Sequence, residues 1–332
     1  MHLGLMLGYW TYGPEDPIEL VLEAERLGFD SVWTAEAYGS DAISPLCWLG
    51  ARTTRIRLGT AIMQISARTP ACVAMTAATI DHLSGGRLIL GIGVSGPQIV
   101  EGWYGQPFPK PMARTREFVD LVRQIMRRES PVEFQGEHYQ LPCRSGANAG
   151  RPLRLTIPTL RPEVPIFLGA EGPRNIGLAK EIGDGWLPLF LSPYRSEVYA
   201  DALQAAPPGF EIACPVTVVL SDDLQQAMTS VKWSLGFYIG AMGARRRNFH
   251  IDMLCAMGFE GAIERIQKLF AEGRREAAAA AVPDELADEL ALIGSADRIR
   301  DRLQAWKESP ITTLLAGTRD PKALRVLAEA MG

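Results

Sequence analysis

The sequence predicts a (β/α)8 barrel, the TIM-barrel fold, and three observations support this prediction. Short apolar runs alternate with amphipathic helical patterns along most of the chain, which is typical of β-α units and a parallel sheet. Eight of these runs are expected to form strands, the number that closes such a barrel. The chain has 332 residues, of which 47% are hydrophobic, so one large domain can bury a sufficient core.

The first half of the chain shows the alternation most clearly. His2–Gly8 is an apolar run that ends in glycine, and Asp16–Leu27 has apolar residues at helical spacing before Gly28. Pro70 stands in the first turn of a later helix, where proline is favoured. The other elements expected here are the strands Ser31–Ala35, Ile56–Met63 and Arg87–Val94 and the helices Ile43–Arg52, Pro70–Leu83 and Ala113–Arg128.

Two segments interrupt the alternation in the second half. Ser130–Pro162 is rich in proline and glycine, with a strand-like piece at Val132–Leu141, and Asp222–Glu308 is largely helical in pattern. We therefore expect a single domain over 1–332 with insertions at about 130–162 and 222–295. The remaining expected elements are the strands Val164–Ala170, Gly185–Leu189, Glu211–Leu220 and Ile311–Ala316 and the helices Pro173–Ile182, Pro193–Ala205 and Asp320–Ala330.

Composition excludes several classes of protein. A net charge of −4 argues against general binding to nucleic acid or to anionic membranes. The five cysteines are scattered without a C-x-x-C pair and the four histidines lack metal-ligand spacing, so we expect reduced thiols and no metal site. The N-terminus lacks the pattern of a signal peptide, and no apolar run approaches the ~18 residues of a membrane span. These features predict a cytoplasmic protein.

A glycine-rich motif follows the fourth expected strand. Gly91–Gly96 matches G-x-G-x-x-G, but a dinucleotide-binding fingerprint also needs a long helix to begin at once. The glycines and prolines between 102 and 111 prevent such a helix here. The motif is better interpreted as a barrel strand whose end lets the backbone approach a ligand closely, or as strand-end glycines without a ligand.

Four segments then carry a family resemblance that covers nearly the whole chain. They resemble, in order and spacing, the bacterial luciferase-like oxidoreductase superfamily: Trp33–Tyr38, Ile56–Met63, Thr79–Gly96 and Phe167–Arg174. Within it, Gly8-Tyr9-Trp10 together with Ala35–Asp41 looks like the branch that uses the deazaflavin coenzyme F420.

The resemblance implies a luciferase-like (β/α)8 barrel that binds a flavin-type ring at the C-terminal ends of its strands. It implies a non-prolyl cis peptide between Ala61 and Ile62, which forms a bulge against the ring. Gln64 would lie beside the ring edge. The other implied cofactor-binding residues are Gly93, Val94 and Ser95 along the ribityl chain and Ala170, Glu171, Gly172, Pro173 and Arg174 at the phosphate, where a helix begins.

The sequence departs from the family pattern where an acid is expected. Many deazaflavin members carry an Asp-His pair after the second strand, and here these positions hold Glu36 and Ala37. The family's acid in the glycine-rich segment falls on Gly96. General acid chemistry must then come from water or from the nearest candidates, Glu36, Tyr38 and Asp41. Tyr38 could instead pack on the ring, and Asp41 could cap the next helix.

The resemblance as a whole implies an F420-dependent oxidoreductase. It would transfer a hydride between the deazaflavin and a carbon of a small organic substrate, by C=C or C=N reduction or by alcohol oxidation. The alternatives are an FMN-dependent monooxygenase of the same superfamily and a non-catalytic flavin-binding protein. Arg245, Arg246 and Arg247 form either a solvated turn or a contact to an anionic ligand.

A homodimer is also expected. The superfamily commonly dimerises through barrel helices, and the helices expected at Ile43–Arg52 and Pro70–Leu83 carry apolar residues beyond one narrow stripe. Examples are Cys47, Trp48, Leu49 and Met75.

Overall fold

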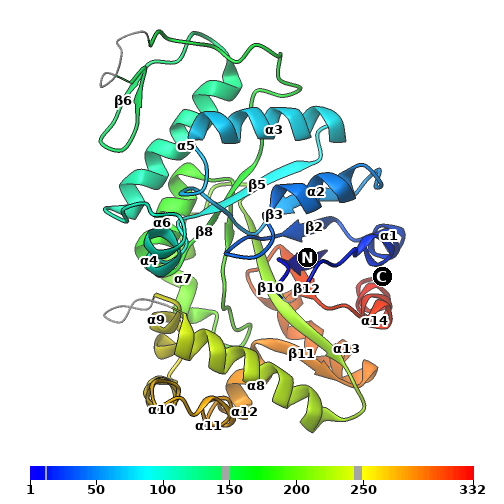
Figure 1. Ribbon diagram of the computed structural model, residues 1–332. Coiled ribbons are helices and arrows are strands. Elements are labelled where there is room, and N and C mark those ends of the chain that lie inside the picture. The colour runs from blue at the N-terminus through cyan, green and yellow to red at the C-terminus, as the bar shows by residue number, and fades with distance from the viewer. Residues whose placement is uncertain (12, 144–149, 243–248) are drawn as a thin grey trace.

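The computed structural model describes residues 1–11, 13–143, 150–242 and 249–332, and it forms a parallel barrel surrounded by helices. Figure 1 shows the two ends of the chain close together, with the first strand beside the last one and α1 beside α14. The barrel strands are β1 (His2–Gly8), β2 (Ser31–Thr34), β3 (Arg57–Thr60), β5 (Leu88–Gly93), β8 (Ile166–Gly169), β9 (Gly185–Leu187), β10 (Glu211–Leu220) and β12 (Thr313–Gly317).

The strands pair side by side around the barrel, and two pairings complete the ring. β12 pairs with β1 in parallel, as His2 opposite Thr313, and β9 pairs with β10, as Gly185 opposite Glu211. The ring therefore contains eight strands, and the predicted (β/α)8 barrel is confirmed. All eight run in the same direction, so their C-terminal ends share one edge of the barrel.

The helices cover the outside of the barrel, and several begin at recognisable caps. Thr69, Asp223, Ser295 and Asp320 each accept a hydrogen bond from a backbone N–H in the first turn of the helix that follows. The helices of the main barrel are α1 (Ile18–Arg26), α2 (Ile43–Gly50), α3 (Pro70–Ser84), α4 (Pro97–Gly102), α5 (Pro111–Arg127), α6 (Pro173–Ile182), α7 (Glu197–Leu203), α13 (Ala296–Glu308) and α14 (Pro321–Met331).

Apolar side chains fill the barrel interior. Trp33 and Phe167 lie with ring centroids 5.8 Å apart, and Ile89, Leu187, Ala213 and Leu315 complete this inner cluster. A Cβ added at Gly59 would lie only 2.3 Å from the Trp33 ring, so the glycine leaves room for the indole. Because the interior is packed, a ligand has to bind at an end of the barrel.

One predicted strand is split. The residues from Ile56 to Met63 were expected as a single strand, but β3 ends at Thr60 and a separate short strand, β4 (Met63–Gln64), follows. The peptide bond between Ala61 and Ile62 is cis, as predicted, and it lies at the interruption. The Thr60 hydroxyl donates to Gly91 O at 2.7 Å and accepts from Gly91 N at 3.0 Å, so a side chain bridges to β5 there.

The two irregular segments differ in structure. The first contains only a short hairpin, β6 (Phe134–Gln135) with β7 (Gln140–Leu141), in its described part. The second contains α8 (Leu224–Ala241), α9 (Phe249–Ala256), α10 (Glu260–Ala271), α11 (Arg275–Ala280) and α12 (Asp284–Glu289).

The prediction for the second segment missed one strand. Asp222–Glu308 was expected to be largely helical, but β11 (Ala291–Gly294) lies within it and pairs with Thr217–Leu220 of β10. Among the described residues, no helix combines the length and the hydropathy needed to cross a membrane.

Candidate active site

The C-terminal ends of four neighbouring strands bring the expected cofactor residues together. Gln64 of β4 is in register with Gly93 of β5, and Gly93 is in register with Gly169 of β8. Ala61, Ile62, Val94 and Ser95 directly flank these positions. Residues that are more than 100 positions apart in the chain therefore share one edge of the barrel.

The Ile62 side chain sits on two glycines. A Cβ added at Gly93 would lie 2.5 Å from Ile62 Cδ1, and one at Gly169 would lie 2.9 Å from Ile62 Cγ2. Any larger residue at either position would push the isoleucine away from the strand ends. The bulge at Ala61–Ile62 is thus supported from below by residues of β5 and β8.

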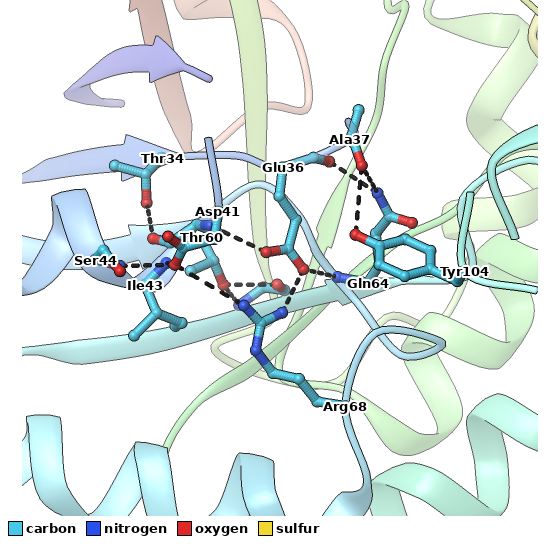
Figure 2. Close-up of polar contacts among 12 residues, drawn as sticks. Thr34, Glu36, Ala37, Asp41, Ile43, Ser44, Thr60, Gln64, Arg68 and Tyr104 are labelled. Atoms are coloured by element: carbon cyan, nitrogen blue, oxygen red, sulfur yellow. Dashed lines mark hydrogen bonds and ion pairs between the residues drawn. The ribbon is translucent and has the colours of Figure 1, made fainter. Parts of the chain in front are cut away.

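Glu36 lies at the centre of a hydrogen-bonded network after β2 (Figure 2). Its Oε1 accepts from the backbone N of Gln64 at 2.9 Å and from Arg68 Nη1 at 2.5 Å. Its Oε2 accepts from the backbone N of Ala42 at 3.0 Å. With only 3% of its side chain exposed, Glu36 is a buried carboxylate surrounded by donors.

Gln64 completes this network from the neighbouring strand. Its Nε2 donates to the backbone oxygen of Glu36 at 3.1 Å and to that of Ala37 at 3.4 Å. Its side-chain oxygen, Oε1, is buried and has no hydrogen-bond partner. Buried side-chain oxygens are normally paired, so an unpaired one at a strand end indicates a missing donor.

Asp41 and Tyr38 occupy different surroundings. Asp41 Oδ1 accepts from the backbone N–H groups of Ile43 and Ser44, both at 2.8 Å, and so caps α2. Burial acts to raise the pKa of Asp41, but hydrogen bonds from Ser44 and Ile43 and the charge of Arg68 outweigh it, so the pKa lies below its usual value. Tyr38 is half exposed.

Two further residues belong to this site, and the sequence analysis missed Arg68, whereas Tyr104 could be expected either to line the substrate pocket or to anchor its loop. Arg68 binds Glu36 and lies 3.9 Å from Asp41 Oδ1, and Tyr104 donates from its hydroxyl to Ala37 O at 3.3 Å. Burial would lower the pKa of Arg68, but Glu36 and Asp41 raise it above its ordinary value. Arg68 is the one charged residue between Gln64 and the start of α3, and this could have pointed to it.

The expected phosphate-side segment follows β8. Gly172 has a φ of +77°, which glycine adopts readily, and it leads into Pro173 at the first turn of α6. Pro173 and Arg174 are exposed, whereas Ala170 is buried and accepts from Trp186 Nε1 at 2.8 Å. The start of α6 therefore presents the N-terminus of a ten-residue helix next to Gly169.

Glu171 faces inward from the same segment. Its Oε1 accepts from the backbone N of Leu189 at 2.8 Å. Burial raises the pKa of Glu171 to about 8, against a lowering by this hydrogen bond. The carboxyl also influences the ionisation of Tyr199 and Cys214, two residues of the core outside the barrel. Glu171 thus connects the segments that follow β8 and β9.

Within the described residues, no three His, Cys, Asp or Glu side chains are placed to hold a metal ion. Arg245, Arg246 and Arg247 lie outside the residues that the structure describes.

Comparisons with known proteins show the family of the chain. A profile of the family described as luciferase-like monooxygenase matches residues 4–313. The chain belongs to this family. It is an enzyme of the luciferase-like class, and the predicted resemblance to that superfamily is confirmed.

One relative of this luciferase-like enzyme is a protein of Mycobacterium tuberculosis (strain ATCC 25618 / H37Rv) named "Putative coenzyme F420-dependent oxidoreductase". The two are 48% identical over 340 residues, which cover 99% of this chain and 98% of the relative.

Two solved structures share the luciferase-like fold. The coenzyme F420-dependent tetrahydromethanopterin reductase of Methanopyrus kandleri matches with a TM-score of 0.78 and 21% identity, over 99% of this chain and 97% of that one. An F420-dependent secondary alcohol dehydrogenase in complex with an F420–acetone adduct matches with a TM-score of 0.78 and 19% identity, over the same shares. At these identities the likeness establishes the fold.

Proposed function

We propose that this protein is an F420-dependent oxidoreductase that transfers a hydride between the deazaflavin and a carbon of a small organic substrate. The observation that carries the proposal is the 48% identity, over nearly the full chain, to a relative named for coenzyme F420. The reaction would be reduction of a C=C or C=N bond or oxidation of an alcohol.

Two features of the barrel edge fit a deazaflavin ring. The Ile62 bulge provides an apolar support, which packs on two glycines. The unpaired Oε1 of Gln64 could accept a hydrogen bond from a ring N–H or hydroxyl. Gly93, Val94 and Ser95 would line the adjoining chain of the cofactor. Gly172, Pro173 and Arg174 would hold its phosphate at the start of α6, where backbone N–H groups favour an anion.

Bound F420 would supply a ring carbon that exchanges hydride in two-electron steps and reacts poorly with oxygen. The chain's own residues bind and orient it. Glu36 holds Gln64 through the backbone N–H and neutralises Arg68, so we infer that it is a positioning residue and not a proton donor. Asp41 is likewise committed to capping α2. A proton needed by the substrate would then come from water or from a tyrosine hydroxyl.

A paired titration tests the cofactor. We expect F420 to quench the protein's fluorescence at lower concentration than FMN does. Gln64→Ala should weaken F420 binding because it removes the acceptor, while Gln106→Ala, at an exposed position after α4, serves as the control. Tighter binding of FMN, together with oxygen consumption that depends on substrate, would assign the protein to the FMN-dependent monooxygenases instead.

A further inference from the structure

Three tyrosines, here called the tyrosine cluster, lie at the barrel edge that carries the proposed cofactor site. Tyr9 directly follows β1, Tyr38 lies in the loop after β2, and Tyr238 lies near the C-terminal end of α8. In Figure 1, α8 begins at the lower right, and its C-terminal end reaches the left side near α7 and α9. The cluster thus joins the ends of two barrel strands to the second insertion.

Close backbone contacts hold the loop that carries Tyr38 against the segment that carries Tyr9. A Cβ added at Gly39 would lie 2.0 Å from Trp10 O and 2.9 Å from Tyr9 Cδ2, so the loop carrying Tyr38 packs tightly on Tyr9. The backbone N of Trp10 also donates to Ser40 Oγ at 2.9 Å. Tyr9 and Tyr38 therefore belong to one rigid corner of the barrel edge.

Aromatic rings position Tyr238 from the other side. It packs edge-on against Phe190, which follows β9, with ring centroids 5.9 Å apart and an interplanar angle of 87°. Phe237, which is 44% exposed, contacts Tyr238 at 6.3 Å in a similar geometry. On this side the tyrosine cluster is thus bordered by apolar rings.

The three hydroxyls have no hydrogen-bond partner among the described residues. None of them forms a hydrogen bond with any residue that the structure describes, whereas Tyr199 donates to Phe190 O at 2.8 Å and Tyr104 donates to Ala37 O at 3.3 Å. Burial raises the pKa of Tyr9 to about 12, with smaller contributions from Tyr238 and Tyr38. Burial and then Tyr38 also raise the pKa of Tyr238. Tyr9 and Tyr238 therefore keep their protons near neutral pH.

We propose that the tyrosine cluster recognises the substrate and selects neutral, mostly apolar molecules that carry a carbonyl or hydroxyl oxygen. Uncharged hydroxyls can donate to such an oxygen, and the surrounding rings accept an apolar body. An anion would lose its hydration without gaining a free countercharge from Arg68 or Arg319, because these two arginines at the strand ends already pair with Glu36 and Glu15. This inference rests on the proposed function, since it names the substrate class of the same site.

Calorimetry with two matched probes tests the proposal. Acetophenone is neutral, and 4-acetylbenzoate is the same ketone with a carboxylate. We expect the F420-loaded enzyme to bind acetophenone at least about tenfold more tightly than 4-acetylbenzoate. The double variant Tyr9→Phe/Tyr238→Phe should bind acetophenone about fivefold to thirtyfold more weakly, the loss expected for two neutral hydrogen bonds.

Tyr194→Phe is the control, because Tyr194 is also a tyrosine but its ring lies against Arg302 and not in the cluster. Equal or tighter binding of 4-acetylbenzoate, no measurable binding of acetophenone, or unchanged binding in the double variant would overturn the proposal.

Titration of F420 into the same samples separates this inference from the proposed function. If F420 binds normally but acetophenone does not bind as expected, only the proposed substrate class is wrong. If the wild-type protein does not bind F420, the cofactor assignment is wrong. Binding of the two probes to the cofactor-free protein then still shows which of them the tyrosine cluster recognises.

Discussion

At position 36, both carboxylate oxygens accept hydrogen bonds from fixed donors, two of them backbone N–H groups and one Arg68. A carboxylate held in this way keeps neighbouring groups in place. We therefore expect Glu36→Gln to lower turnover by about tenfold, below the 10²–10⁴-fold typical of a lost general acid, and to weaken F420 binding in parallel.

Tyr38→Phe, which removes one exposed hydroxyl, should be similarly mild. Steady-state rates followed by F420 absorbance, with cofactor titration of each variant, measure both effects. A thousandfold fall in turnover at unchanged cofactor affinity, for either variant, would identify that residue as the proton donor after all.

Glu171 gives a prediction about pH. Its carboxyl titrates at a pKa of about 8 in the folded chain, against an ordinary value of 4.5, because burial disfavours the charged form. The folded state therefore binds this proton more tightly than the unfolded state does. The contribution of this bound proton to the free energy of unfolding is complete below the ordinary pKa of 4.5, and it is lost as the pH rises through about 8.

Melting temperatures recorded across this pH range test the assignment. The melting temperature of Glu171→Gln should fall less than that of the wild-type protein as pH rises, because the glutamine has no proton to lose. Glu181→Gln, at an exposed carboxylate paired with Arg116, should keep the wild-type slope. A Glu171→Gln profile parallel to that of the wild type would mean that another group titrates.

At the scale of a single strand, two glycines of β5 should respond differently to the same substitution. A Cβ at Gly93 meets the movable end of Ile62, whereas a Cβ at Gly91 would lie 1.7 Å from the backbone oxygen of Thr60. We expect Gly93→Ala to displace Ile62 toward the cofactor, which lowers F420 affinity with little loss of stability. Gly91→Ala should instead lower the melting temperature, because a backbone oxygen cannot move aside.

Melting curves and F420 titrations of both variants distinguish the two effects. The interpretation fails if Gly93→Ala destabilises the fold as much as Gly91→Ala does, or if it leaves F420 affinity unchanged.

Hydrophobic pattern and turn residues predicted most elements, and the failures have physical causes. Pro173–Ile182 and Glu211–Leu220 were predicted with the bounds observed, because proline, glycine and a long β-branched run mark them. Ala291–Gly294 was missed, since four apolar residues after a helix-favouring stretch look like its continuation. The split of the third strand has no signature in hydrophobic periodicity, and only the family resemblance predicted its cis peptide.

The candidate site was predictable only in part. Strand ends are visible in the sequence, and the family resemblance pointed to Glu36, Gln64 and Gly93 at them. The pairing of Glu36 with Arg68 joins two loops 32 residues apart, and no local pattern reports such a contact. For the same reason, Tyr238 could not be connected with Tyr9 before the fold was known.

For the whole molecule, two outer helices leave apolar residues uncovered. On α2, Leu46 and Leu49 are buried in the core while Trp48 is 48% exposed; on α3, Met75 is 57% exposed. Cys47 and Cys72 are exposed on the same two helices. We propose that these faces meet in a homodimer, which would bury them.

Light scattering should therefore give twice the mass of one 36.3 kDa chain. Trp48→Glu combined with Met75→Glu should give the monomer mass, because each charge would be buried twice in a symmetric interface. Trp233→Glu changes an equally exposed tryptophan on α8 and should leave the dimer intact. A monomer mass for the wild-type protein would refute the proposal.

The long strand β10 has a consequence for how this enzyme can diverge from its relatives. Thr217 pairs with Gly317 on one edge and with Ala291 on the other, so the strand that returns from the second insertion belongs to the same sheet as the barrel. The helices α8 to α12, of which α8 carries Tyr238, thus begin after Leu220 and end before Gly294, and these two residues are partners in neighbouring strands. A chimera that exchanges these helices with the two residues kept in register would replace the wall that faces the substrate while the strand ends proposed to hold the cofactor keep their own residues.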